Sequence, residues 1–199
     1  MKKKIFYGLA ALMVAVLLSS CSKAPQTEID QANAAIDSAK AAGAEIYVPD
    51  AFAALQDSMN AVIIMIEEQD SKLIKSYADS KEKLAQISVM AREVALKSDT
   101  RREEIKTETL AILSEVKSLL EENKQLISAA PKGKEGTAAL QAMKNELNVI
   151  ETSVAEVEGM FAEGELLACH SKASAAKEKA QMMNTELTEV IAKYNKARR

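Results

Sequence analysis

Few residues in this chain interrupt a helix. Among 199 residues there are six glycines, three prolines and no tryptophan, and aromatic residues make up 4%. Alanine, glutamate, lysine and leucine dominate instead, a composition typical of long helices and coiled coils. We therefore expect an all-α protein, an elongated antiparallel helical bundle built from coiled-coil hairpins.

Residues that carry chemistry are also scarce. The only histidine is His170, beside Cys169, so the three or four ligands of a typical zinc site are missing. There is no glycine-rich phosphate loop and no nucleophile motif. Paired carboxylates such as Glu67-Glu68 are expected on a solvated helix face. We predict no enzyme activity, no catalytic residue, no metal site and no cofactor, and we assign no ligand-binding residue.

Long apolar runs are absent as well. The longest extends from Ile5 to Leu18 behind three lysines, and it is shorter than the ~20 residues that a membrane-spanning helix needs. A basic start, a short apolar stretch and small residues at its end are typical of a secretory signal. We therefore predict that residues 1–20 are a signal peptide that is cleaved off.

The signal ends in Leu18-Ser19-Ser20-Cys21, which resembles the lipobox of bacterial lipoproteins. The resemblance implies cleavage between Ser20 and Cys21 and a covalent lipid, such as palmitate, on Cys21. Residues 21–26 would then form a lipidated tether. Ser22 replaces the aspartate that retains many lipoproteins in the inner membrane, which favours the periplasmic face of the outer membrane. The alternative is an ordinary signal peptide that happens to end near a cysteine.

The mature chain lacks a basic cluster and a second free cysteine. Removing residues 1–20 takes away three of the 26 basic residues. The mature chain then has 23 basic and 29 acidic residues, which gives a net charge of −6. Nucleic acid is not an expected partner, because phosphate binding needs clustered lysine and arginine. With Cys21 lipidated, Cys169 has no partner for a disulfide, and we expect it to be a small buried residue.

Residues 27–130 are predicted to form an N-terminal helical region. Apolar residues at steps of three and four indicate a helix from Thr27 to Gly43 and a second from Pro49 to Glu67. Glycine suits the end of a helix and proline its first turn. The polar residues 67–71 indicate a turn, with Asp70 or Ser71 capping the next helix.

One long helix is expected after this turn. Residues 70–130 contain neither glycine nor proline, and an apolar stripe begins at Ile74 but loses phase across residues 97–104. The segment is either one helix or two helices with a break near Asp99. In the second case Thr100 and Glu103 would form a capping box.

Residues 131–199 are predicted to form an antiparallel helical hairpin. Steps of three and four run without error before and after Gly164, which permits a tight turn. Pairing outward from this turn sets large residues against small ones: Leu147, Ile150 and Val154 against Ala173, Ala176 and Ala180. There is also a faint internal echo between Lys81-Glu82-Lys83 and Lys177-Glu178-Lys179, explained by duplication or by coincidence.

Residues 27–94 carry an alanine-rich pattern with a fixed glycine, proline and phenylalanine. Its matching residues are Ala32, Ala35, Ile36, Ala39, Gly43, Ala44, Pro49, Phe52, Leu55, Tyr77 and Ala78. This pattern resembles a family of small helical bacterial lipoprotein domains of unknown function, which often precede an OmpA-like peptidoglycan-binding domain. The resemblance implies an envelope location and no known chemistry. Here more helix follows instead, so no motif supports contact with peptidoglycan.

These features predict a non-enzymatic lipoprotein of the cell envelope. We expect a helical spacer or binding scaffold that is held to the outer membrane through Cys21. The alternative is an accessory subunit whose long helix outruns the others and is completed by self-association or by a helix of another envelope protein.

Overall fold

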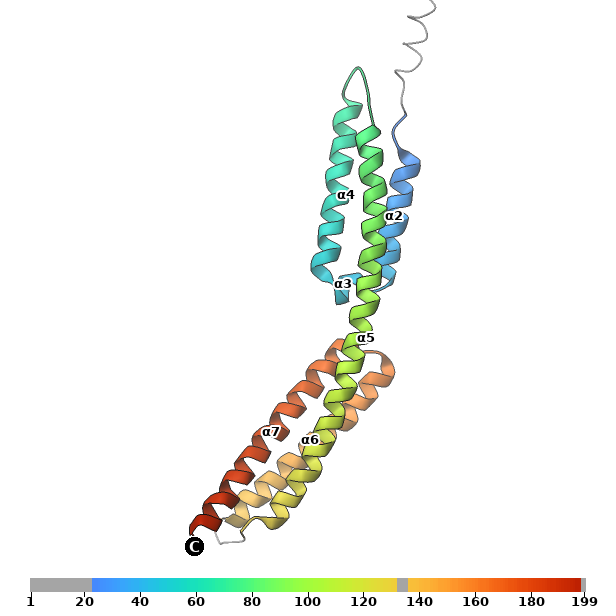
Figure 1. Ribbon diagram of the computed structural model, residues 1–199. Coiled ribbons are helices and arrows are strands. Elements are labelled where there is room, and N and C mark those ends of the chain that lie inside the picture. The colour runs from blue at the N-terminus through green and yellow to red at the C-terminus, as the bar shows by residue number, and fades with distance from the viewer. Residues whose placement is uncertain (1–22, 132–135, 198–199) are drawn as a thin grey trace, which may run out of the picture. The chain divides into compact units, whose positions relative to one another are not determined.

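Six helices make up the part of the chain that the structure describes. The computed structural model describes residues 23–131 and 136–197, so the predicted signal, cleavage and lipidation residues lie outside it. The helices are α2 (Gln26–Ala41), α3 (Ala44–Tyr47), α4 (Pro49–Asp70), α5 (Ala78–Ala129), α6 (Gly136–Glu163) and α7 (Leu166–Ala197) (Figure 1). The described residues include no strand, and the predicted all-α helical bundle is confirmed.

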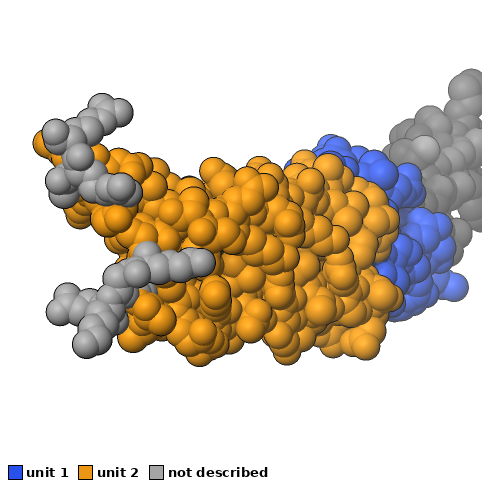
Figure 2. All heavy atoms as spheres, turned by 90° about the horizontal axis from the view of Figure 1, so that it is seen from below, with its two compact units in different colours: residues 1–101 blue, residues 102–199 orange. Residues whose placement is uncertain are grey.

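The chain divides into two compact units that share α5. Unit 1 comprises residues 1–101 and unit 2 residues 102–199 (Figure 2). In the described residues, α2, α4 and the first part of α5 enclose one apolar core, and the rest of α5 encloses another with α6 and α7. The two units therefore divide within α5, between residues 101 and 102, whereas the predicted regions divide between residues 130 and 131.

In unit 1, helices α2 and α5 run parallel to each other, and α4 runs antiparallel to both (Figure 1). Large side chains of α4, among them Phe52 and Leu55, pack with the alanines of α2 and with Leu84 of α5. An ion pair of 2.7 Å joins Glu28 of α2 to Lys81 of α5. At the other end, the Ser98 hydroxyl donates to the Ala42 carbonyl at 2.8 Å. These two contacts show that α2 and α5 are parallel.

In unit 2 the predicted hairpin is present. Gly164 adopts a positive φ of 84°, and the Glu165 amide donates to the Met160 carbonyl at 3.1 Å, which closes the end of α6. The Cys169 thiol donates to the Val157 carbonyl at 3.4 Å, so these residues lie opposite each other. This register agrees with the predicted pairing of large and small residues, all of which are buried: Leu147, Ile150, Val154, Ala173, Ala176 and Ala180.

Helix α5 is continuous, and there is no break near Asp99. Thr100 does not cap a new helix, because its hydroxyl donates to the Leu96 carbonyl within α5 at 2.9 Å. The buried face continues through Ser98 and Thr109. Both hydroxyls donate to backbone carbonyls, which makes their burial tolerable. The predicted loss of phase thus reflects polar residues that are buried with their hydrogen bonds satisfied.

The connection between α4 and α5 differs from the prediction. Helix α4 continues to Asp70, and α5 begins at Ala78 rather than at Asp70 or Ser71. The Ser71 hydroxyl turns back to the Glu68 carbonyl at 2.7 Å. Ile74 is not part of the apolar stripe, since it lies in the connecting loop and is 79% exposed.

The alternative of an accessory subunit is based on an apolar stripe of the long helix left uncovered, and the structure does not leave it uncovered. The distal stripe of α5 is covered within unit 2, where Leu113, Val116, Leu120 and Ile127 are buried. Self-association or a partner helix remains a prediction, and sedimentation of the full chain tests it.

Each of the two similar Lys-Glu-Lys segments supplies a lysine that pairs with a glutamate of another helix in its unit. Lys81 of the Lys81-Glu82-Lys83 segment binds Glu28, and Lys177 of the similar Lys177-Glu178-Lys179 segment binds Glu115. The first segment lies in the first turns of α5 and the second in the interior of α7, so their positions within the helices differ. Duplication and coincidence both stay open as explanations of the echo.

Two glycines predict opposite effects of alanine on stability. Gly43, two residues beyond the end of α2, has a φ of +84°, and a Cβ there would lie 3.0 Å from the Tyr47 ring. A Cβ at Gly159 within α6 would meet nothing within 4 Å. Gly43→Ala is expected to cost about 1–2 kcal/mol through the left-handed backbone, plus the contact with the ring. Gly159→Ala should stabilise by about 0.5–1 kcal/mol. Urea unfolding of both variants measures the difference, and a stabilising Gly43→Ala would contradict the assigned turn.

Candidate functional site

The predicted lipidation site can be located only through the residues that follow it. Cys21 and Ser20 lie outside the described residues, and Lys23 is the first residue within them. Lys23 follows Cys21 by two residues, and two residues of chain span at most about 7 Å. Pro25 is buried, and its carbonyl accepts the Ile29 amide at 3.0 Å in the first turn of α2. The chain is thus bound to the bundle soon after Cys21.

An open cleft lies at this end of unit 1. Residues that precede and begin α2 form one side, and residues at the end of the α4–α5 loop and the start of α5 form the other. The lining residues are Lys23, Ala24, Gln26, Thr27, Glu28, Lys75, Ser76, Tyr77, Ala78 and Lys81. The cleft therefore brings three lysines together next to the predicted anchor.

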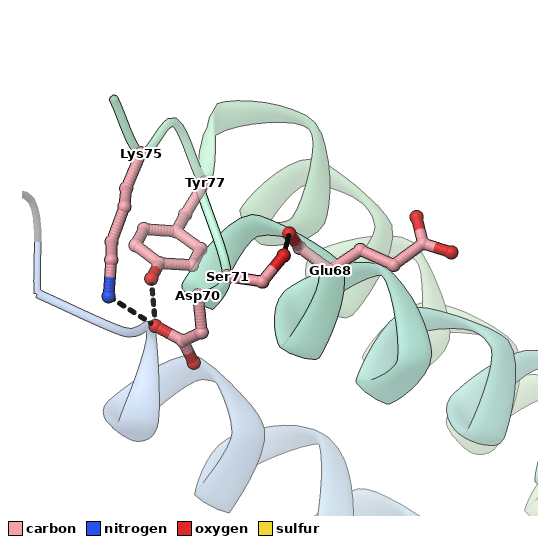
Figure 3. A network of polar contacts seen from close by, with 5 residues as sticks. All are labelled: Glu68, Asp70, Ser71, Lys75 and Tyr77. Carbon is pink, nitrogen blue, oxygen red and sulfur yellow. Dashed lines mark hydrogen bonds and ion pairs between the residues drawn. The ribbon is translucent and has the colours of Figure 1, made fainter. Parts of the chain in front are cut away.

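Asp70 organises the loop beside the cleft. Its Oδ1 accepts a short hydrogen bond from the Tyr77 hydroxyl and an ion pair from Lys75 Nζ at 3.1 Å (Figure 3). The hydrogen bond from Tyr77, and then that from Lys75, lowers the pKa of Asp70. The same bond, assisted by burial of the tyrosine, raises the pKa of Tyr77 to about 12. The last residue of α4 therefore holds both ends of the loop's final segment.

These pKa values predict a stability change at high pH. An unfolded tyrosine titrates near pH 10, so the raised pKa of Tyr77 stabilises the fold below about pH 10 and loses this effect as pH rises towards about 12. Asp70 acts at the other extreme, where its lowered pKa gives stability that is lost as pH falls below about 4. Tyr77→Phe should flatten the decline of the melting temperature between pH 10 and 12.

Tyr47→Phe is the matched control for this titration. Tyr47 lies in α3, at the other end of α4 from the network. Circular dichroism melts at several pH values should show the wild-type decline in Tyr47→Phe and a shallower one in Tyr77→Phe. Identical slopes in all three proteins would show that the Asp70–Tyr77 bond does not contribute.

Glu28, the carboxylate that lines the cleft, is also engaged by a lysine. The pKa of Glu28 is lowered, first by the hydrogen bond from Lys81. Glu28 and Asp70 are therefore ionised at neutral pH, and neither is poised near pH 7 as a general acid or base would be. This arrangement suits the binding of anionic or interfacial groups better than proton transfer.

The other residues singled out from the sequence do not gather into a reactive site. Cys169 is buried, and burial raises the pKa of its thiol. His170 contacts Glu108 of α5 instead, with its Nε2 3.2 Å from Oε2. Glu121 binds Lys124, which also binds Glu151 of α6. Within the residues that the structure describes, no group of three or more histidine, cysteine, aspartate or glutamate side chains could hold a metal ion.

Comparison with protein-family models, curated proteins and solved structures finds no match to this chain. The resemblance of residues 27–94 to helical lipoprotein domains therefore stays a prediction, as does the lipobox. None of the helices in the described residues is both long enough and apolar enough to cross a membrane.

Sequence reasoning missed the cleft and the loop beside it. Lys23 and Lys81 are far apart in the chain, and only the parallel packing of α2 and α5 brings them together. A signal for the loop was present in Lys72-Leu73-Ile74-Lys75, where two apolar residues stand between lysines. The spacing of apolar residues instead predicts the start of a helical stripe at Ile74.

Proposed function

We propose that the protein is a lipoprotein of the bacterial outer membrane, anchored at its periplasmic face by a lipid on Cys21. The observation that carries this proposal is the order of lysines, apolar run and Leu18-Ser19-Ser20-Cys21 at the start of the chain. Each CH₂ of an acyl chain adds roughly 0.8 kcal/mol of membrane affinity, so several chains on one cysteine form a stable anchor.

On this anchor the helices act as a non-enzymatic spacer or binding scaffold in the envelope. Supporting this, the described residues form two helical bundles whose cores are apolar and whose polar surface residues pair with one another across helices. Catalysis needs polar groups that converge in a pocket. The cleft at the start of α2 is open, and its lining carboxylate Glu28 and the neighbouring Asp70 are each engaged by a lysine.

Metabolic labelling tests the proposal. Cells that express the full chain are grown with labelled palmitate, and the protein is isolated from separated inner and outer membranes. We expect label in the protein, outer-membrane recovery and a mature mass that begins at Cys21. An unlabelled chain cleaved at another residue would overturn the lipid anchor, whereas a labelled chain in the inner membrane would overturn only the sorting.

A further inference from the structure

Two adjacent large apolar side chains project into solvent at the α4–α5 loop. Leu73 is fully exposed and Ile74 is 79% exposed. Single exposed apolar residues are common on soluble proteins, but a neighbouring pair at the tip of a loop more often marks a contact with a partner or a membrane. Neither side chain belongs to the apolar core of unit 1.

This loop lies at the same end of unit 1 as Lys23 and the start of α2, the described residues nearest in sequence to the predicted anchor. Lys23 and Lys75 line the same cleft, and Lys23 follows Cys21 by two residues. If Cys21 carries the lipid, the anchor and the apolar tip are on the same end of the bundle. The tether is too short to carry that end far from the bilayer, because two residues span at most about 7 Å.

The charges around the tip suit a headgroup region. Lys72 and Lys75 flank the apolar pair, and Lys23 and Lys81 line the adjacent cleft. Lysine stems lie along apolar surface while their amines reach phosphate groups. Glu28 and Asp70 neutralise part of this charge. The apolar pair therefore supplies the main contact with an apolar phase, and the lysines contact the headgroup layer at its surface.

The loop is also held in position from within. Asp70 binds Lys75 and Tyr77, and the Ser71 hydroxyl binds the Glu68 carbonyl, so both ends of the loop are joined to the end of α4 (Figure 3). Because the loop is already ordered, little conformational entropy is lost when its apolar tip makes a contact.

We propose that Leu73 and Ile74 insert into the phospholipid bilayer beside the lipid anchor and seat this end of unit 1 on the membrane. The proposal rests on the proposed lipidation of Cys21. The occupant of the apolar tip is the bilayer itself, with phospholipid phosphates near the lysines.

The absence of tryptophan allows a direct test. The full chain is produced with Leu73→Trp, purified as the mature protein and reconstituted into vesicles of phosphatidylethanolamine and phosphatidylglycerol. The control is Ile46→Trp, an exposed apolar position in α3. It lies at the opposite end of α4, whose 22 residues span about 33 Å. Ile74→Trp is a second reporter in the loop.

We expect blue-shifted emission and loss of fluorescence with brominated acyl chains for Leu73→Trp and Ile74→Trp, and little of either for Ile46→Trp. Flotation and the mass of the mature chain report the anchor separately. A lipidated, floating protein whose Leu73→Trp emission is no more quenched than that of Ile46→Trp would overturn the inference alone. An unlipidated chain that does not float would overturn both the inference and the anchor.

Discussion

The Cys21→Ala chain is expected to leave the outer membrane and to take up no palmitate. The lipid on Cys21 would supply most of the affinity for the bilayer, at roughly 0.8 kcal/mol for each buried CH₂. The apolar run of the predicted signal is too short to replace it by spanning the bilayer. Immunoblots of soluble, inner-membrane and outer-membrane fractions measure the change.

Cys169→Ala is the matched control for that experiment. It removes the second cysteine, whose thiol is buried in unit 2 and donates to the Val157 carbonyl. This variant should remain labelled and in the outer membrane. A Cys21→Ala chain that still fractionates with the outer membrane would mean that protein contacts, rather than a lipid, hold it there.

Ala176→Leu is expected to lower the stability of unit 2 substantially. Ala176 is 3% exposed and lies on the face of α7 that packs against Ile150 of α6. The added methylene groups would overpack this seam at a cost of about 1–3 kcal/mol. In a chain of this size each kcal/mol lowers the melting temperature by about 2–4 °C. Thermal melts followed by circular dichroism measure the shift.

Ala175→Leu separates overpacking from a general effect of leucine on α7. Ala175 is the neighbouring residue, but its side chain is exposed. Alanine and leucine have similar helix propensity, so this variant should melt close to the wild type. Equal losses in the two variants would show that the buried face of α7 is assigned incorrectly.

The hairpin of α6 and α7 was the part of the fold most fully predictable from the sequence. Its apolar steps are regular, and a glycine marks its only turn, so local rules determine both the helices and their pairing. Gly164 and the opposition of Ile150 to Ala176 follow from these rules alone. Pro49 likewise marks the start of α4 correctly.

Predictions from the apolar pattern were wrong where polar residues are buried or apolar residues are exposed. Ser98 and Thr109 are buried on α5, yet they are polar, so an apolar-stripe rule loses the helix there. Ile74 is apolar and exposed, so the same rule places it wrongly in a core. The short α3 after Gly43 was missed because its four residues are too few to show a period.

The cleft depends on tertiary packing and could not be predicted from local patterns. Its lysines come from the residues before α2, from the loop and from α5, and no local spacing links them. The ion pair between Glu28 and Lys81 and the hydrogen bond from Ser98 to Ala42 reveal the register of the two parallel helices. The predicted lipidation motif, in contrast, is a contiguous pattern and its prediction requires no knowledge of the fold.

Helix α5 also has a consequence for how the chain unfolds. It passes without a loop from the core of unit 1 into the core of unit 2. Extending a helix that already exists avoids the unfavourable nucleation step, so each folded unit lowers the free-energy cost of ordering the neighbouring segment of α5. In a nearest-neighbour description this is a favourable coupling term between the units. Stabilising changes on α6 or α7 are therefore expected to slow hydrogen exchange of α5 amides on the unit 1 side of residue 101 as well.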